Sequence, residues 1–227
     1  MARLGVLFLS NDITYHGEDP EFGPSMADSR RYDHAPIVRQ VPGAWTSNVI
    51  SGDPACEDAY VKAAQKLVDE GANAITCDCG FTLRYQQAIA AAVAVPVSTS
   101  SLLMLPMLLS TVPANKKIAV LTADSRHLDD SMLASLGITQ PGRLVIEGWE
   151  GTATYSFFSA RKGEINVAEV LADTDKIIAR VRRHDNIAAI LCECTTFVRV
   201  SPRIRKATRL PVYDAGNNVT LLLAAAG

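Results

Sequence analysis

Two short motifs in the sequence each separate a pair of cysteines by one acidic residue. They read Cys77-Asp78-Cys79-Gly80 and Cys192-Glu193-Cys194-Thr195. Each motif follows an apolar run typical of a buried strand and precedes a helical pattern. Cys79 and Cys194 are therefore expected at strand ends beside helix N-termini, where free N–H groups stabilise a thiolate. Two thiols on opposite sides of one small ligand can remove a proton from one face of a carbon and return a proton to the other. This arrangement predicts acid/base chemistry that inverts a stereocentre.

An internal repeat relates the two motifs. Residues 4–10 match residues 118–124, residues 74–80 match 189–195, and residues 95–97 match 210–212, at an offset of 114 or 115 residues. Three anchors in the same order with nearly one spacing predict two similar lobes related by an approximate twofold axis. The axis would bring Cys79 and Cys194 to face each other across the cleft. Cys77 and Cys192 lie two residues deeper in their strands and are expected to be buried.

The elements that must position these thiols alternate between strands and helices. The apolar runs that predict strands are residues 4–9, 74–77, 95–97, 118–122, 144–147, 187–192 and 211–213. The helical patterns between them cover residues 57–70, 83–93, 102–110, 125–136, 167–184 and 218–226. Strands that are apolar on both faces belong to parallel sheets covered by helices. The predicted fold class is therefore α/β, with two pseudosymmetric lobes, each a mainly parallel sheet flanked by helices, and an active site in the cleft between them.

We expect residues 1–112 to form the first lobe, completed by a C-terminal helix over residues 216–227, and residues 113–215 to form the second. Two segments interrupt the alternation. Residues 13–44 are long, polar and rich in Gly, Pro and aromatic residues, and residues 149–163 form a smaller counterpart in the second half. Segments of this kind are lids or interface arms, so we expect substrate specificity to reside in them.

Composition excludes several functional classes. With 22 basic and 24 acidic residues the chain has a net charge of −2, which gives no basic field for nucleic acid. Its apolar runs are shorter than the roughly 18 residues that span a membrane. Five cysteines, an odd number, favour free thiols in a reducing cytoplasm over a disulfide framework. The sequence has no pyridoxal lysine motif, dinucleotide loop or cluster of metal-ligating histidines, so we expect no cofactor and no metal.

The sequence resembles the aspartate/glutamate racemase superfamily, which also contains hydantoin racemases, maleate isomerases and arylmalonate decarboxylases. The resemblance covers essentially the whole chain and rests on residues 4–12, 76–81, 97–102, 120–124 and 191–195. It places Cys79 and Cys194 on the two catalytic cysteine positions and implies a homodimer. Glutamate racemases of this superfamily have a histidine directly after the second cysteine, whereas this chain has Thr195 and Thr196. Arylmalonate decarboxylases keep only the second thiol.

The superfamily holds substrate carboxylates with backbone N–H groups and short polar side chains at strand ends. By position, the residues expected to bind substrate here are Ser10, Asn11, Gly80, Phe81, Thr122, Ser125, Thr195 and Thr196. The same residue types also serve as helix caps. Asp78 and Glu193 point away from the flanking cysteines in a strand, so we expect them to accept hydrogen bonds from loop backbone.

Two other uses of the cysteines fit the spacing less well. Paired zinc ligands are usually separated by two to four residues, and the recognised redox motif is C-x-x-C, whereas one residue intervenes here. The sequence thus predicts a cofactor-independent racemase or epimerase that acts at the α-carbon of a small carboxylate. A maleate-type cis/trans isomerase with a covalent cysteine adduct and a non-catalytic small-molecule binding protein are the alternatives.

Overall fold

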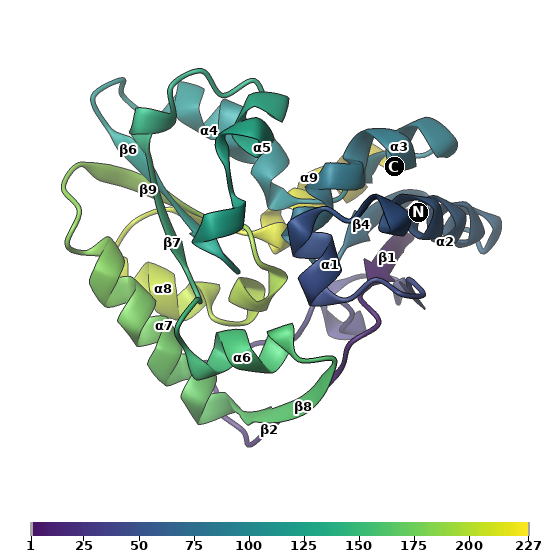
Figure 1. Cartoon of the computed structure of the whole chain (residues 1–227), viewed down its shortest axis with the longest axis horizontal. Helices are drawn as coiled ribbons and strands as arrows, with labels where there is room; N and C mark the ends of the chain where they lie inside the picture. The colour runs from purple at the N-terminus through teal and green to yellow at the C-terminus, as the bar shows by residue number, and fades with distance from the viewer. Residues whose placement is uncertain (1, 227) are drawn as a thin grey trace.

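Two four-stranded parallel sheets form the centre of the molecule in a computed structural model that describes residues 2–226. The first sheet has the order β3-β1-β4-β5 and the second the order β10-β9-β6-β7. The first consists of β1 (Leu4–Phe8), β3 (Ile37–Gln40), β4 (Ala74–Cys77) and β5 (Val97–Ser98). The second consists of β6 (Lys117–Thr122), β7 (Leu144–Gly148), β9 (Ile187–Cys192) and β10 (Val212–Tyr213). The α/β class and the two-lobed arrangement predicted from the sequence are confirmed, and the lobes lie on opposite sides of Figure 1.

The central strands of both sheets are apolar on both faces. β4 is buried along its whole length, and β1, β6 and β9 have at most two residues each that are not fully buried. β1 pairs with β4 as β6 pairs with β9, with Leu7 opposite Cys77 and Leu121 opposite Cys192. The matching register is the structural form of the sequence repeat. It brings both cysteine motifs to the carboxyl ends of central strands, where parallel sheets form ligand sites.

Helices cover both sheets. Those of the first half are α1 (Thr46–Ser51), α2 (Glu57–Asp69), α3 (Gln86–Ala92) and α4 (Leu105–Thr111). Those of the second half are α5 (Asp130–Ser135), α6 (Ala153–Ser159), α7 (Val167–Val181), α8 (Ser201–Thr208) and α9 (Ala215–Ala226). No helix within residues 2–226 is long and apolar enough to cross a membrane.

α7 shows why these helices form and how they pack. Asn166 caps its N-terminus by accepting a hydrogen bond from the Ala168 N–H at 2.8 Å, and Glu169 places a negative charge in the first turn. Val170, Ile177 and other apolar residues at helical spacing are buried against the sheet. The helix is therefore capped at its N-terminus and packed along its apolar face.

α9 and α4 each contact the lobe built mainly by the other half of the chain. α9 contacts β4 and β5 of the first sheet, and α4 contacts β6 of the second. Val219 on α9 packs in a small apolar cluster with Leu4 and Val6 of β1. This exchange ties the two lobes together.

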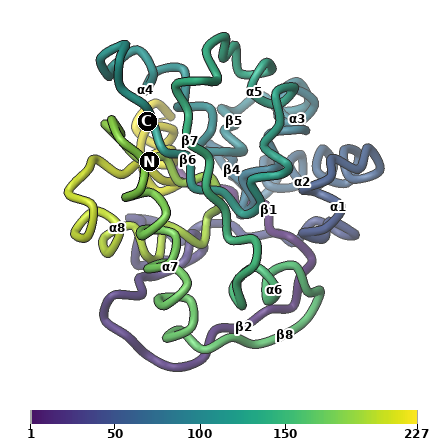
Figure 2. The backbone as a smooth tube through the Cα atoms, turned by 60° about the vertical axis from the view of Figure 1, so that its left-hand side comes forward, coloured from purple at the N-terminus to yellow at the C-terminus, as the bar shows by residue number. Residues whose placement is uncertain are grey.

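The segment over residues 13–44 is more regular than the sequence predicts. It contains the end of β2 (Asp12–His16) and all of β3, an edge strand of the first sheet. β2 pairs in parallel with β8 (Lys162–Asn166), so residues from the two long segments join in a small sheet, visible at the bottom of Figures 1 and 2. These strands alternate between exposed and partly buried residues, which gives no continuous apolar run in the sequence.

The connection between the lobes is fixed by Arg143, which precedes β7. Its guanidinium donates hydrogen bonds to the carbonyls of Leu109 and Pro113 at 3.1 Å, and of Val112 and Lys116 at 3.3 Å. One side chain thus satisfies four backbone acceptors between α4 and β6. The linker is held against the second lobe.

We expect Arg143→Met to lower the free energy of unfolding by about 2 kcal/mol, since hydrogen bonds to a charged group contribute in that range and the carbonyls lose their donor. Urea unfolding followed by circular dichroism measures the loss. Arg183→Met is the control, because Arg183 is exposed on the surface after α7. Equal midpoints for the two variants would show that water replaces the guanidinium without cost.

Candidate active site

The two cysteine motifs continue the central strands by one residue each. The Asp78 N–H donates to the Leu7 carbonyl at 2.9 Å, and the Glu193 N–H donates to the Leu121 carbonyl at 2.6 Å. Cys79 and Cys194 then begin the 3₁₀ helices Gly80–Tyr85 and Thr195–Arg199. The helical starts predicted after both motifs are present, with tighter winding than an α-helix.

The motifs touch each other across the boundary between the lobes. The Thr195 hydroxyl donates a hydrogen bond to the Asp78 carbonyl. At the matching position in the other motif, a Cβ on Gly80 would collide with both the carboxyl group and the carbonyl oxygen of Glu193. Close approach of the strand ends therefore requires glycine at position 80.

A cavity of about 520 Å³ lies where the strand ends meet. Its wall combines the two thiols, both acidic residues, several hydroxyl groups and a set of aromatic rings. The lining residues that matter for the chemistry are Phe8, Asn11, Tyr15, Phe22, Thr46, Asp78, Cys79, Gly80, Phe158, Glu193, Cys194, Thr195, Thr196 and Arg199. A cavity of this size suits a small-molecule ligand.

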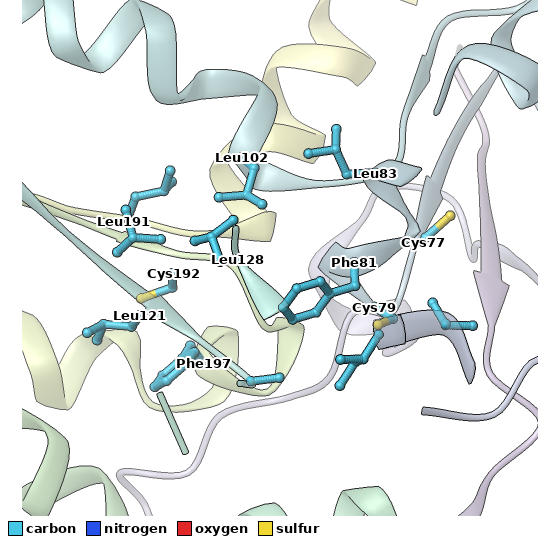
Figure 3. Close-up of a cluster of buried hydrophobic side chains, with 14 of the residues drawn as sticks. Cys77, Cys79, Phe81, Leu83, Leu102, Leu121, Leu128, Leu191, Cys192 and Phe197 are labelled. Atoms are coloured by element: carbon cyan, nitrogen blue, oxygen red, sulfur yellow. The ribbon is translucent and has the colours of Figure 1, made fainter. Parts of the chain in front are cut away.

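The four cysteines of the motifs divide into two kinds. Cys77 and Cys192 are at most 1% exposed, among apolar side chains of the core. Cys79 and Cys194 lie on the cavity wall. Figure 3 shows the sulfurs of Cys77 and Cys79 pointing apart from one strand end. The burial predicted for Cys77 and Cys192 is confirmed, and the catalytic role of Cys79 and Cys194 stays a prediction.

Both cavity thiols are protonated at neutral pH, contrary to the stabilised thiolates expected from the sequence. Burial and the nearby Glu193 carboxylate raise the pKa of Cys79 well above its ordinary value. The same two causes raise the pKa of Cys194 to about 12. Helix-start N–H groups do favour both thiolates, but desolvation and the neighbouring negative charge outweigh them.

More hydrogen bonds favour the thiolate form of Cys194 than that of Cys79. The backbone N–H of Phe81 favours the Cys79 thiolate, whereas both the N–H and the hydroxyl of Thr196 favour that of Cys194. Phe81 and Thr196 occupy equivalent positions in the repeat, two residues after their cysteines. Cys194 is also partly accessible, whereas Cys79 is 8% exposed. The pair is therefore chemically unequal.

Asp78 and Glu193 accept hydrogen bonds from backbone, as predicted. Asp78 Oδ1 accepts from the Leu9 N–H and Glu193 Oε2 from the Ala123 N–H, both at 3.0 Å. Leu9 and Ala123 are again equivalent in the repeat. Burial raises the pKa of each carboxyl to about 7 against this hydrogen bonding. Glu193 Oε1 is buried without a hydrogen-bond partner among the described residues.

Half of the residues predicted to bind substrate lie on the cavity wall. They are Asn11, Gly80, Thr195 and Thr196. The Asn11 side chain, however, is occupied: its amide donates to the carbonyls of Phe158 and Ala160 at 3.2 and 2.5 Å and accepts from the Thr46 N–H. It joins the end of β1 to α6.

The other predicted binding residues lie outside the cavity. Ser10 donates to the Val41 carbonyl at 2.6 Å, and Thr122 donates to Glu193 Oε2 at 2.8 Å. Ser125 bonds to the Glu150 carboxylate, and Phe81 is fully buried. The contacts of these residues are structural: they brace the strand ends and the acidic residues behind the cavity.

The aromatic rings of the cavity wall and Arg199 were not predicted from the sequence. Tyr15 is on β2 and Phe22 on the loop after it, and their ring centroids lie 5.3 Å apart. Both come from the segment over residues 13–44, whose conformation has no signal in the sequence. Arg199 did have a signal, since it matches Arg84 in the repeat.

Comparison with known proteins identifies relatives of this site and fold, although no family model matches. A dimethylsulfoniopropionate lyase of Durusdinium sp. clade D is 31% identical, over 94% of this chain and 71% of its own length. Dimethylsulfoniopropionate lyase 2 of Emiliania huxleyi is 34% identical, over 94% of this chain and 69% of the relative. The chain spans between 55% and 64% of three other Emiliania huxleyi lyases.

Solved structures of low sequence identity share the fold. Allantoin racemase from Klebsiella pneumoniae aligns with a TM-score of 0.63 at 11% identity, over 99% of this chain and 87% of that one. Arylmalonate decarboxylase aligns at 0.57 with 16% identity, covering 100% and 93%. Glutamate racemase from Francisella tularensis aligns at 0.58 with 14% identity, covering 95% and 80%.

The chain thus belongs to the family that includes the dimethylsulfoniopropionate lyases. It shares its fold with allantoin racemase, arylmalonate decarboxylase and glutamate racemase, which is the fold that the resemblance to the aspartate/glutamate racemase superfamily implied. It is an enzyme. The predicted function of racemase or epimerase is wrong, because the relatives that share about 30% identity over most of the chain are named as lyases.

The two buried carboxyls predict an unusual pH dependence of stability. Their pKa of about 7 lies above the ordinary values of 3.8 for Asp and 4.5 for Glu. Between about pH 4 and pH 7 the folded protein therefore holds protons that the unfolded chain has released, and their contribution to the free energy of unfolding falls as pH rises. Glu193→Gln, which keeps the shape but cannot ionise, should flatten this slope and be more stable than wild type at pH 8.

Urea unfolding at pH 5, 6, 7 and 8 measures the slope for both proteins. Glu169→Gln is the matched control, because Glu169 is exposed in the first turn of α7. Parallel pH profiles for wild type and Glu193→Gln would contradict a raised pKa at Glu193.

Proposed function

We propose that the chain is a C–S lyase that cleaves a sulfonium-bearing carboxylate of the dimethylsulfoniopropionate class by β-elimination. The observation that carries this proposal is the pairing of two cavity thiols with an aromatic wall. The names of the relatives support the same reaction class.

The aromatic wall suits a sulfonium group. A sulfonium cation has no polar hydrogen to donate, so electrostatic attraction to aromatic faces and carboxylates binds it in place of hydrogen bonds, as for quaternary ammonium ions. Phe8 and Phe158 line the cavity and offer such faces, whereas the rings of Tyr15 and Phe22 already lie against the guanidinium of Arg199. Asp78 and Glu193, on the same wall, add negative charge when ionised.

Elimination needs one base. The Cys194 thiolate takes a proton from the carbon next to the carboxylate, and the electron pair of that C–H bond forms the carbon–carbon double bond. The C–S bond breaks with its pair on sulfur, which releases neutral dimethyl sulfide and leaves acrylate. The sulfide departs without a proton, so no second acid is required. The proton on Cys194 then returns to water.

Cys194 is the better candidate for this base. Burial raises its pKa to about 12, and both the hydroxyl and the N–H of Thr196 oppose this rise, whereas only the N–H of Phe81 opposes the rise in the pKa of Cys79. A bound cation favours the thiolate further, because opposite charges lower the pKa of a thiol. The sulfonium group of the substrate thus favours the thiolate that removes a proton from the same substrate molecule.

We expect Cys194→Ser to lower kcat for dimethylsulfoniopropionate by about 100-fold or more, the usual contribution of a general base.

Thr196→Val, which removes one hydrogen bond to the thiolate, should lower kcat about five- to tenfold and move the rise of the pH–rate profile to higher pH. Headspace gas chromatography of dimethyl sulfide and proton NMR of acrylate measure the rates.

Cys56→Ala is the control, since Cys56 is buried near Tyr85 and does not line the cavity. It should retain the wild-type rate at 25 °C. If folded wild-type protein releases no dimethyl sulfide, the proposed lyase activity is wrong. If Cys194→Ser keeps the wild-type rate, Cys194 is not the base.

A further inference from the structure

Arg199 is a cation in the cavity wall without a carboxylate to neutralise it. Its Nη1 donates to the Gly23 carbonyl at 3.1 Å, and its guanidinium lies 4.7 and 4.9 Å from the ring centroids of Tyr15 and Phe22. Among residues 2–226 no Asp or Glu lies within ion-pairing distance of it, and Nε and Nη2 make no hydrogen bond. Partial burial lowers its pKa.

The equivalent arginine in the other lobe shows what a structural role looks like. Arg84 lies five residues after Cys79, as Arg199 lies five after Cys194. Arg84 donates to the carbonyls of Ile50 and His127 at 3.2 and 3.0 Å and lies 4.0 Å from the Asp129 carboxylate. It does not line the cavity. Arg84 thus uses its donors in contacts that hold the fold together, whereas Arg199 keeps free donors at the cavity.

Arg199 is held in place by contacts that leave its donors free. Stacking on two rings fixes the plane of a guanidinium without using its N–H groups. The backbone supports this position, because the Gly23 N–H donates to the Arg199 carbonyl at 2.7 Å. A partly desolvated cation is stabilised when an anion binds it, and a planar guanidinium matches a carboxylate with two parallel hydrogen bonds.

We propose that Arg199 binds the carboxylate of the substrate and so fixes the direction in which the substrate lies, an assignment that rests on the proposed function for the identity of the ligand. Tyr15, over whose ring Arg199 lies, is 3.4 Å from Thr196 through their hydroxyls, and Thr196 in turn favours the Cys194 thiolate. A carboxylate at Arg199 therefore presents the adjacent carbon toward Cys194. Repulsion by Arg199 sends the sulfonium toward the opposite part of the cavity.

The test uses binding, so that it is independent of turnover. The probes are 3-(trimethylammonio)propionate, which keeps both charges but has a poorer leaving group, and its primary amide, which lacks the negative charge. Isothermal titration calorimetry compares wild type, Arg199→Met and Arg199→Lys. Arg183→Met, on the exposed surface, is the control for a lost positive charge.

We expect wild type and Arg183→Met to prefer the acid over the amide by about tenfold or more, the effect of a charged hydrogen-bonded pair. Arg199→Met should bind both probes equally weakly, and Arg199→Lys should recover part of the preference. Equal affinity of wild type for acid and amide, or an unchanged preference in folded Arg199→Met, overturns the assignment. The two proposals fail separately: Arg199-dependent binding of the acid by a protein that releases no dimethyl sulfide refutes the lyase activity alone.

Discussion

The strand ends that carry Cys79 and Cys194 approach so closely that one of them has no room for a side chain. Gly80 lies against the carboxyl and carbonyl groups of Glu193, and the Thr195 hydroxyl bonds to the carbonyl of Asp78. Several features of the fold hold the two strand ends in this contact. Parallel sheets bring carboxyl ends together, Arg143 fixes the linker, and α4 and α9 each pack on the opposite lobe. The residues of this contact line the cavity together with both thiols.

Close approach has an electrostatic cost that shapes the chemistry. Two carboxyls and two thiols share a region with little water, and each group raises the pKa of the thiols beside it. The two carboxyls thus keep their protons to a higher pH than exposed carboxyls do. A cationic ligand reverses this balance, because it favours carboxylate and thiolate together. In the proposed function, selectivity for a cation and activation of the base would then follow from one arrangement of charges.

The sequence predicted the parts of this arrangement that repeat. The offset of 114 or 115 residues identified both sheets, the central strands and the cysteines on the cavity wall, because buried parallel strands and their terminal residues leave a continuous apolar pattern. It did not predict β2, β3 or β8, which lie at sheet edges and mix exposed with partly or fully buried residues, so that none of them forms a long apolar run. The aromatic wall was missed for the same reason, since Tyr15 and Phe22 reach the cavity through the β2–β8 pair and its following loop. Ser10 and Thr122 illustrate another limit: short polar residues at strand ends look alike in sequence whether they contact ligand or backbone.

Differences between the halves of the repeat carry the remaining functional information. Gly80 matches Thr195, Phe81 matches Thr196, and Arg84 matches Arg199. In each pair the second half places a polar group on the cavity wall, while the first half supplies a close contact, a core ring or an ion pair. A reaction that delivers a proton to the opposite face needs two comparable thiols. The proposed elimination, which releases a neutral sulfide, needs one base and a fixed substrate direction, and the roles proposed for Thr196 and Arg199 would supply both.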